Sequence, residues 1–127
     1  MSAAGQIQVL DLEIGPQLAI VRGEGSAHAV VWPGVDAQLR SMHCVRLAPG
    51  ATTIELSHPS EAVYYVVRGV GSVSDPAAGE TEPLREGSMF HVDPGTVYVI
   101  EAGAQPIELV GGPSPADDSL YERAAGA

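Results

Sequence analysis

The stretch that decides the fold runs from Gly50 to Gly71 and reads GATTIELSHPSEAVYYVVRGVG. It holds two β-rich runs, Thr52–Ser57 and Val63–Arg68, on either side of a Pro-Ser turn, and a glycine lies at each end. Glycine suits these ends because turns between strands often need a positive φ, which residues with a Cβ resist. We therefore expect two successive short strands here.

The rest of the chain repeats this pattern of short β-rich runs separated by Gly, Pro and Asp. No stretch shows a sustained 3.6-residue period, apart from a last turn of helix at Asp118–Arg123. Many short strands in one domain are typical of a sandwich or a barrel, so the predicted fold class is all-β. We predict ten strands, which are Gln17–Arg22, Ala27–Trp32, Gln38–Leu47, Thr52–Ser57, Val63–Arg68, Gly71–Ser74, Thr81–Leu84, Ser88–Val92, Thr96–Glu101 and Pro106–Val110.

The chain has the size of one domain. Its 127 residues would bury roughly two-thirds of the surface of the unfolded chain, which leaves no room for a second core. Hydrophobic residues make up 45%, more than a disordered chain carries. No apolar run approaches the roughly 20 residues that cross a bilayer, and the N-terminus lacks the pattern of a secretory signal. We expect a cytoplasmic protein without a membrane partner.

Charge and cysteine content exclude further classes. Six Lys and Arg against 16 Asp and Glu give a formal net charge of -10, which repels phosphate backbones and anionic lipid surfaces. Nucleic acid is therefore not an expected partner. Cys44 is the only cysteine, so the chain has no intrachain disulfide and no thiolate metal cluster. Its place in a β-rich run favours a buried structural thiol.

Two segments, Pro49–Gly71 and Gly87–Glu101, resemble the two sequence motifs of the cupin family, small jelly-roll barrels whose histidines usually hold a divalent metal. The resemblance rests on the spacing of the glycines, on the Pro-Gly turns and on the lengths of the strands. It implies a single-domain, cupin-type jelly-roll β-barrel, also called a double-stranded β-helix.

In this resemblance, most of the family's metal ligands are replaced. The first motif places its two histidines at Leu56 and His58 and its glutamate at Ala62, and the second motif places its histidine at Tyr98. Three of the four ligand positions have therefore changed together. One imidazole is too few to hold Fe, Mn, Ni or Zn inside a barrel, so no cofactor is predicted at the family site.

Strand alternation indicates which side chains share the barrel interior. Leu56 and His58 lie on one face of their strand, and Tyr64 shares the parity of Ala62 and Val66. A neutral imidazole with one or two phenols in an apolar barrel makes a proton-transfer pair. The predicted catalytic residues are His58, Tyr98 and Tyr64, and the predicted ligand pocket consists of Leu56, Ala62, Val66, Ile100, His43 and His91.

Metal-free cupins that isomerise or epimerise sugars, or cyclise polyketide-like intermediates, are similar in using histidine and tyrosine inside the barrel. The resemblance thus implies a metal-independent isomerase, epimerase, cyclase or lyase that acts on a small organic molecule. His58 would be the base or acid, and Tyr98 its partner. The alternative is a non-catalytic small-molecule binding barrel, because most of the predicted pocket is apolar.

A third hypothesis is a metal-dependent cupin oxygenase or lyase that holds one divalent Fe, Mn, Ni or Zn through relocated ligands. His43 lies on the better inward face of its run, whereas the orientation of His91 is undecided. A one-residue bulge after the Pro-Ser turn would point Glu61 inward. The relocated ligands would then be His58, His43, His91 and Glu61.

We expect the barrel to span residues 1–110 and a Pro/Gly-rich C-terminal tail to follow at 111–127. The segment 111–117, GGPSPAD, is predicted not to continue a strand, and the tail is expected to lie across the barrel or across a partner subunit. Cupins commonly pair, so a homodimer is expected, with the N-terminal strands Gln6–Leu12 and Gln17–Arg22, within residues 6–22, as candidates for its interface.

Overall fold

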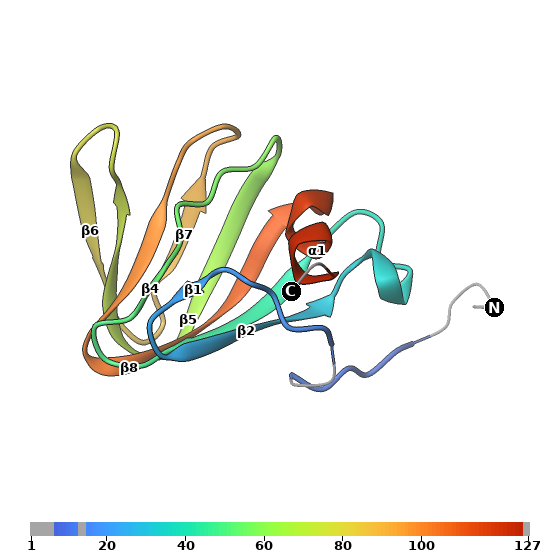
Figure 1. Cartoon of the computed structure of the whole chain (residues 1–127), viewed down its shortest axis with the longest axis horizontal. Helices are drawn as coiled ribbons and strands as arrows, with labels where there is room; N and C mark the ends of the chain where they lie inside the picture. Colours follow the sequence, from blue (N-terminus) through green and yellow to red (C-terminus); the bar gives the residue numbers. More distant parts are fainter. Residues whose placement is uncertain (1–6, 13–14, 126–127) are drawn as a thin grey trace.

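The computed structural model describes residues 7–12 and 15–125 of the chain. They form an all-β, nearly closed barrel with one short α-helix (Figure 1), which confirms the predicted fold class. The strands are β1 (Val21–Arg22), β2 (Gly25–Val31), β3 (Met42–Leu47), β4 (Thr52–Thr53), β5 (Glu61–Asp75), β6 (Glu80–Leu84), β7 (Met89–Val92) and β8 (Val99–Ser114). A 3-10 turn, η1 (Pro33–Val35), follows β2, and the helix α1 (Asp118–Ala125) ends the described chain.

The long strands β5 and β8 connect the two layers of the barrel. The first half of β5 pairs with the second half of β8 and with β7, and the second half of β5 pairs with the first half of β8 and with β6. From β8, the first layer continues through β3 to β2, and the second layer continues through β4 to β1. Each long strand thus belongs to both layers, and the core lies between them.

Glycines allow β5 and β8 to bend without ending. The β5–β8 pairing shifts register between Val66 and Arg68 and again between Gly69 and Gly71. A Cβ on Gly69 would lie 2.0 Å from the carbonyl oxygen of Pro106, so only glycine permits this close approach. The predicted breaks here and at Gly103 are wrong, because two pairs of predicted strands each form one continuous strand.

The prediction that 111–117 cannot continue a strand is also wrong. β8 extends to Ser114, and Gly111, Gly112 and Pro113 pair with β5. Proline lacks a backbone donor, but its carbonyl oxygen here accepts a hydrogen bond from the backbone N–H of Ser41 at 3.2 Å. β8 thus ends at Ser114, shortly before α1 begins at Asp118.

The N-terminal strands differ from the prediction as well. Residues 7–12 form no strand, and Gln6 lies outside the described residues. Within Gln17–Arg22, only Val21–Arg22 form a strand, and Gln17 makes an isolated bridge to His28. By contrast, the helix predicted at Asp118–Arg123 is confirmed by α1. Within the described part of the chain, no helix is long and apolar enough to cross a membrane.

The core confirms the predicted strand parity. Leu56 and His58 are buried while Glu55 and Ser57 are exposed, as alternation along a strand requires. Along β5, the inward side chains are Ala62, Tyr64 and Val66, all at most 2% exposed. Along β3, they are His43, Val45 and Leu47.

Candidate active site

Backbone pairing brings His58 beside Tyr98. Leu56 and Tyr98 form an isolated antiparallel bridge, with backbone hydrogen bonds of 2.9 and 2.8 Å in the two directions. The backbone N–H of Gly95 then donates to the carbonyl oxygen of His58 at 2.8 Å. Because His58 follows Leu56 by two residues, its side chain points to the same interior face. The sequence-predicted pair His58 and Tyr98 is therefore assembled inside the barrel.

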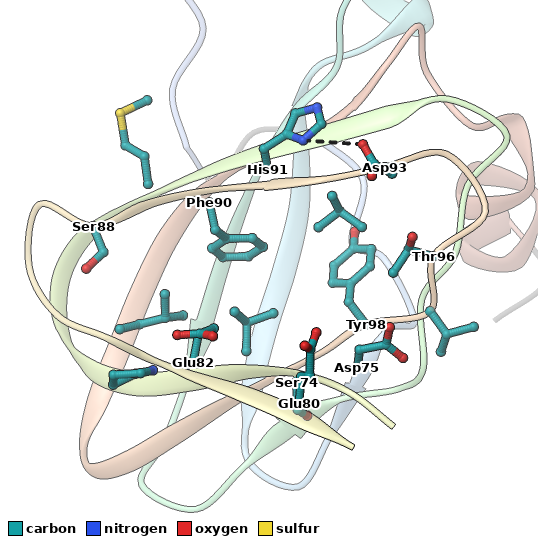
Figure 2. A pocket seen from close by; sticks show the side chains of 16 residues that line it. Ser74, Asp75, Glu80, Glu82, Ser88, Phe90, His91, Asp93, Thr96 and Tyr98 are labelled. Atoms are coloured by element: carbon teal, nitrogen blue, oxygen red, sulfur yellow. Dashed lines mark ion pairs between the residues drawn. The ribbon is translucent and has the colours of Figure 1, made fainter. Parts of the chain in front are cut away.

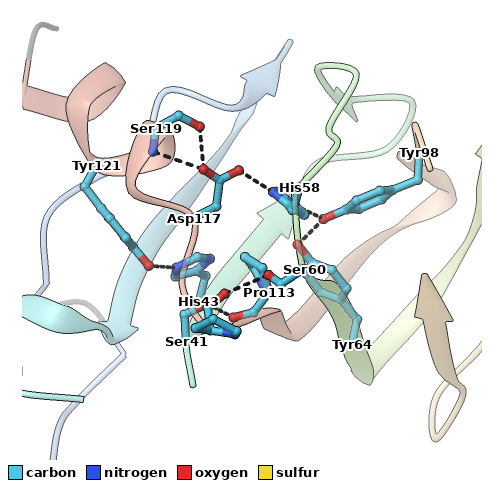
Figure 3. A network of polar contacts seen from close by, with 11 residues as sticks. Ser41, His43, His58, Ser60, Tyr64, Tyr98, Pro113, Asp117, Ser119 and Tyr121 are labelled. Carbon is cyan, nitrogen blue, oxygen red and sulfur yellow. Dashed lines mark hydrogen bonds and ion pairs between the residues drawn. The ribbon is translucent and has the colours of Figure 1, made fainter. Parts of the chain in front are cut away.

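His58 is hydrogen-bonded through both ring nitrogens (Figure 3). Its Nδ1 lies 2.8 Å from Oδ2 of Asp117, and its Nε2 lies 2.7 Å from the phenol oxygen of Tyr98. The phenol oxygen of Tyr64 lies 2.9 Å from that of Tyr98. These four side chains, Asp117, His58, Tyr98 and Tyr64, form what we call the interior network. All three predicted catalytic residues belong to it.

The charge of Asp117 sets the direction of these hydrogen bonds. Burial would raise the pKa of Asp117, but the hydrogen bonds from His58 and Ser119 outweigh it, and the pKa lies below its ordinary value. The ionised carboxylate only accepts, so Nδ1 of His58 carries a proton and donates it. In a neutral imidazole, Nε2 is then the acceptor for the hydroxyl of Tyr98, whose oxygen accepts from Tyr64.

The two phenols of the network stay protonated over the physiological range. Burial raises the pKa of Tyr64 to about 12. Burial, and then the proximity of Tyr64 and Asp117, raise the pKa of Tyr98 well above its usual range. Tyr98 is therefore a neutral hydrogen-bond donor. It can lose its proton only if the phenolate is stabilised or if the proton is replaced at once.

Asp117 was not among the predicted site residues. Its Oδ1 accepts hydrogen bonds from the backbone N–H and the hydroxyl of Ser119, at 3.1 and 2.8 Å, as a helix N-cap does. Its other oxygen binds His58, so one carboxylate both starts α1 and joins the network. An aspartate before a predicted helix is a sequence signal for a cap, but nothing in the sequence indicates a contact with a residue 59 positions away.

A second histidine lies beside the network. His43 is 1% exposed, and its Nε2 lies 2.8 Å from the phenol oxygen of Tyr121, in α1. Burial, and then the neighbouring His58, lower the pKa of His43 to about 4, so the ring is neutral near pH 7. Among the buried side-chain nitrogen and oxygen atoms that the structure describes, Nδ1 of His43 alone has no hydrogen-bond partner.

A cleft of about 610 Å³ approaches the network from the side of β6 and β7. Figure 2 shows Tyr98 within it, near Phe90 and Thr96, and His91 and Asp93 also line it. The other predicted pocket residues lie elsewhere: Leu56, Ala62, Val66 and Ile100 belong to the packed hydrophobic core. Of the predicted site residues, Tyr98 and His91 are thus the ones that border this cleft.

The relocated metal ligands are not brought together. The inward bulge at Glu61 does not form, because Glu61 is exposed and its carboxylate is hydrogen-bonded to Nε2 of the exposed His91. His43 and His58 are buried inside the barrel instead. In the described ranges 7–12 and 15–125, no three His, Cys, Asp or Glu side chains form a group suited to a metal ion.

The family's own metal positions do not offer a fitting donor set either. Leu56 and Ala62 carry no donor atom, and both nitrogens of His58 are engaged by Asp117 and Tyr98. A divalent metal of the Fe or Zn type needs three or four nitrogen, oxygen or sulfur ligands around one point. The residues present at these positions therefore do not fit the metal that the family implies.

The comparisons with known proteins agree with the barrel fold. Residues 43–110, more than half of the chain, match the family model described as a cupin domain, and the chain belongs to the cupin family. No curated protein has a matching sequence.

Solved structures show the same fold at low sequence identity. A predicted oxalate decarboxylase from Thermotoga maritima is 23% identical, with a TM-score of 0.67 over 82% of this chain and 96% of that one. The polyketide cyclase RemF from Streptomyces resistomycificus is 15% identical, with a TM-score of 0.65 over 91% of this chain and 81% of that one. KdgF from Halomonas sp. is 20% identical, with a TM-score of 0.62 over 81% of this chain and 89% of that one. At these identities the likeness concerns the fold.

Proposed function

We propose that this cupin is a metal-independent acid–base catalyst of the isomerase, epimerase, cyclase or lyase type, acting on a small organic molecule. The observation that carries the proposal is the contact of 2.7 Å between Nε2 of His58 and the hydroxyl of Tyr98. A buried histidine and tyrosine at this distance can share a proton, and proton transfer between such groups and a substrate is a step common to all four reaction types.

Asp117 gives His58 the properties of a general base. Its carboxylate holds the proton on Nδ1, which leaves the Nε2 lone pair directed at Tyr98. It also stabilises the positive charge that appears on the ring when Nε2 takes up a proton. The carboxylate orients the imidazole, and the imidazole accepts from the hydroxyl. The same order of groups activates weak nucleophiles and acids in other enzymes.

The phenols supply the complementary acid. Once Nε2 of His58 has taken up a proton, it donates to the oxygen of Tyr98, and the hydroxyl of the buried, neutral Tyr98 is then free to donate to an enolate or oxyanion that develops beside it. Tyr64 donates to the oxygen of Tyr98 and would stabilise that oxygen while its proton is shared. The cleft that Tyr98 borders is the candidate route by which a substrate approaches.

The cupin neighbours support this class of chemistry by name. RemF is named a polyketide cyclase, and cyclisation is one of the reaction types proposed here. The predicted oxalate decarboxylase and oxalate oxidase among the neighbours carry names of a different chemistry. The interior network supports the acid–base class because a buried imidazole and a phenol are in hydrogen-bond contact, and no group of three metal-ligating side chains lies in the described part of the chain.

A solvent-exchange assay tests the proposal. Purified protein is incubated in D2O with a panel of enolisable hydroxyketones and 1,3-dicarbonyl compounds, and deuterium entry at carbon is followed by proton NMR. His58→Gln and Tyr98→Phe should each lower the exchange rate by about 100-fold or more. Glu122→Ala, at an exposed position of α1, is the matched control and should exchange at the wild-type rate. Wild-type exchange rates in both site variants would contradict the proposal.

A non-catalytic binding barrel is the second candidate, and one observation favours it. The side chains of His58, Tyr98 and Tyr64 are each at most 4% exposed. Such burial is also expected of polar side chains that only position a ligand or pack in the core. For any compound that binds the wild type in calorimetry, a pure binder keeps most of its affinity in His58→Gln and shows no deuterium exchange. An enzyme loses exchange far beyond any change in affinity.

Elemental analysis addresses the metal directly. Protein purified without a metal-affinity tag is expected to contain Fe, Mn, Ni and Zn well below one atom per chain, because the donor set does not fit them. A stoichiometric content of any of these metals would contradict the metal-independent mechanism.

A further inference from the structure

The cleft beside β6 and β7 reaches Tyr98, but neither His58 nor His43 lines it. His58 is 4% exposed, Tyr98 2% and His43 1%, and both nitrogens of His58 are engaged. A substrate that exchanges a proton with His58 needs the segment that covers it to move. On the side of Asp117 and Tyr121, that segment is the end of the described chain, α1 and the residues before it (Figure 3).

Two of the described side chains of α1 hold the helix on the barrel. Of its residues with described side chains, Leu120 is buried at 3% exposure and Tyr121 is half-buried, while Asp118, Ser119 and Glu122 are exposed. The ring of Tyr121 packs on Trp32, with 4.9 Å between centroids. A helix of eight residues is too short to be stable in water without such contacts. Release of Leu120 and Tyr121 would therefore remove the described contacts that support the helix.

Asp117 couples the folding of α1 to its docking. One carboxylate oxygen caps the helix through Ser119, and the other binds His58. The carboxylate is held in the right orientation for His58 only while the helix is formed, and the cap is anchored only while His58 holds it. The two contacts thus form and break together.

The closed arrangement also leaves one polar group without a partner. Nδ1 of His43 is buried without a hydrogen bond, while Nε2 of the same ring contacts Tyr121. An unsatisfied buried nitrogen costs free energy, which is recovered when water reaches it. Tyr121 covers the Nε2 edge of this ring, whereas Nδ1 lies on the side of Gly112 in β8, so departure of Tyr121 would expose the Nε2 edge.

We propose that the segment Asp117–Tyr121 with α1 is a lid that opens to admit small molecules to His58 and His43 and, on closing, completes the network by bringing Asp117 to His58. The lid regulates the site of the proposed function, so its catalytic meaning rests on that function. Its opening and closing are measurable without any substrate.

Hydrogen–deuterium exchange measures the opening. The amides of Leu120 to Glu122 are expected to exchange at least 10-fold faster than those of the paired centre of β5 and β8, under conditions where the barrel stays folded. Leu120→Ala should accelerate the lid amides at least 10-fold further and leave the strand amides unchanged, and Glu122→Ala should change neither. If α1 exchanges only together with β5 and β8, it is part of the barrel and the lid proposal is wrong.

Carbethoxylation of histidine by diethyl pyrocarbonate measures access to the site. The chain has four histidines and no lysine, its six basic residues all being arginine, so peptide mass spectrometry resolves each site cleanly. In the wild type, His43 and His58 should react far more slowly than His91, whose side chain is 50% exposed. In Leu120→Ala, their rates should rise at least 10-fold, while the rates of His28 and His91 stay constant. Unchanged rates at His43 and His58, with α1 unprotected, would overturn the gating role.

A gentler variant serves if Leu120→Ala unfolds the barrel. Ser119→Ala removes the hydroxyl contact to Asp117 at an exposed position and should raise lid exchange and His58 carbethoxylation several-fold. No increase in either would also contradict the lid. A lid that opens as described, combined with wild-type deuterium exchange in His58→Gln, would instead retain the lid and reject the proposed function.

Discussion

The ionisation of His43 depends strongly on its burial. Its pKa is lowered to about 4, because desolvation and then the nearby His58 both disfavour the charged ring. An unfolded chain holds histidine at about 6.5. Below pH 6.5 the unfolded state therefore binds a proton that the folded state does not, and stability is lost as pH falls from 6.5 towards 4.

A comparison of wild type with His43→Gln isolates this effect. Between pH 7 and pH 5, the titration of His43 alone should cost the wild type about 2 kcal/mol of unfolding free energy. His43→Gln carries no titrating ring, so its loss over the same interval should be smaller by that amount. Urea denaturation at the two pH values provides the measurement, and parallel losses in the two proteins would contradict the buried neutral ring.

For single residues, strand alternation predicts part of the site. The inward faces of His58, Tyr64 and His43 follow from apolar parity, and the structure confirms all three. The contact between His58 and Tyr98 follows from the family's motif spacing. Asp117 and Tyr121 are not predictable in this way, because they belong to a helix whose docking depends on where β8 ends, and the predicted end at Val110 is four residues too early.

The paired strands β5 and β8 depend on close backbone approach at single glycines. A Cβ on Gly111, at φ +156, would lie 2.1 Å from the carbonyl oxygen of Val63 and 2.6 Å from Cα of Tyr64. Neither backbone atom can move without disrupting the ladder. Gly111 therefore fixes the position of the strand that carries Tyr64.

Alanine at Gly111 should destabilise the fold by about 3 kcal/mol or more, because overpacking of backbone atoms adds to the strain. Gly79→Ala is the matched control, since its φ of +71 imposes strain but no atom lies within 4 Å of the added Cβ. The control should cost about 1 kcal/mol. Equal costs in urea denaturation would show that close approach at Gly111 does not limit the fold.

A buried carboxylate joins three strands on the outer face of the sheet. Oε2 of Glu108, in β8, lies 2.8 Å from Nε of Arg46 in β3, and its Oε1 lies 2.9 Å from Nε of Arg68 in β5. The hydrogen bond from Arg46 outweighs desolvation and lowers the pKa of Glu108. Its contribution to stability is therefore present above pH 4.5 and is lost as pH falls through the lowered pKa.

Glu108→Gln should reduce the unfolding free energy by about 1 to 2 kcal/mol at pH 7, because both arginines lose a charged partner while remaining partly solvated. The difference between wild type and variant should shrink as pH falls below 4.5. Guanidinium denaturation across pH 3 to 7 follows this difference. If the difference in unfolding free energy between wild type and variant stayed constant over that interval, the loss would be due to packing and not to charge.

The strand predictions fail for one physical reason. Glycine marks a turn in most sequences, but here Gly69 and Gly103 lie where long strands cross from one layer to the other. At Gly69 the ladder continues through the bend because glycine tolerates both the φ of +92 and the close contact, whereas Gly103 makes only ordinary contacts. Local sequence cannot distinguish a strand end from a strand bend, since the difference lies in the partner strand.

For the whole molecule, we predict a homodimer. The N-terminal segment is the part of the chain that we expect at its interface. Ile7 and Val9 are 87% and 88% exposed, a costly arrangement for large apolar side chains in a lone chain. Light scattering should give about twice the chain mass of 13.1 kDa for the wild type. Ile7→Asp with Val9→Asp should shift the particle towards the monomer mass, and a wild-type particle of 13.1 kDa would refute the homodimer.

The central claim is that the barrel holds His58 between a carboxylate and a phenol, with the proton on Nδ1. Long-range proton–nitrogen NMR of imidazole-labelled protein at pH 8 measures this directly. The predicted result is a His58 ring protonated at Nδ1 and bare at Nε2, with loss of this preference in Asp117→Asn, because an amide can donate as well as accept. A wild-type ring that carries its proton on Nε2, or that averages between the two forms, would contradict the account.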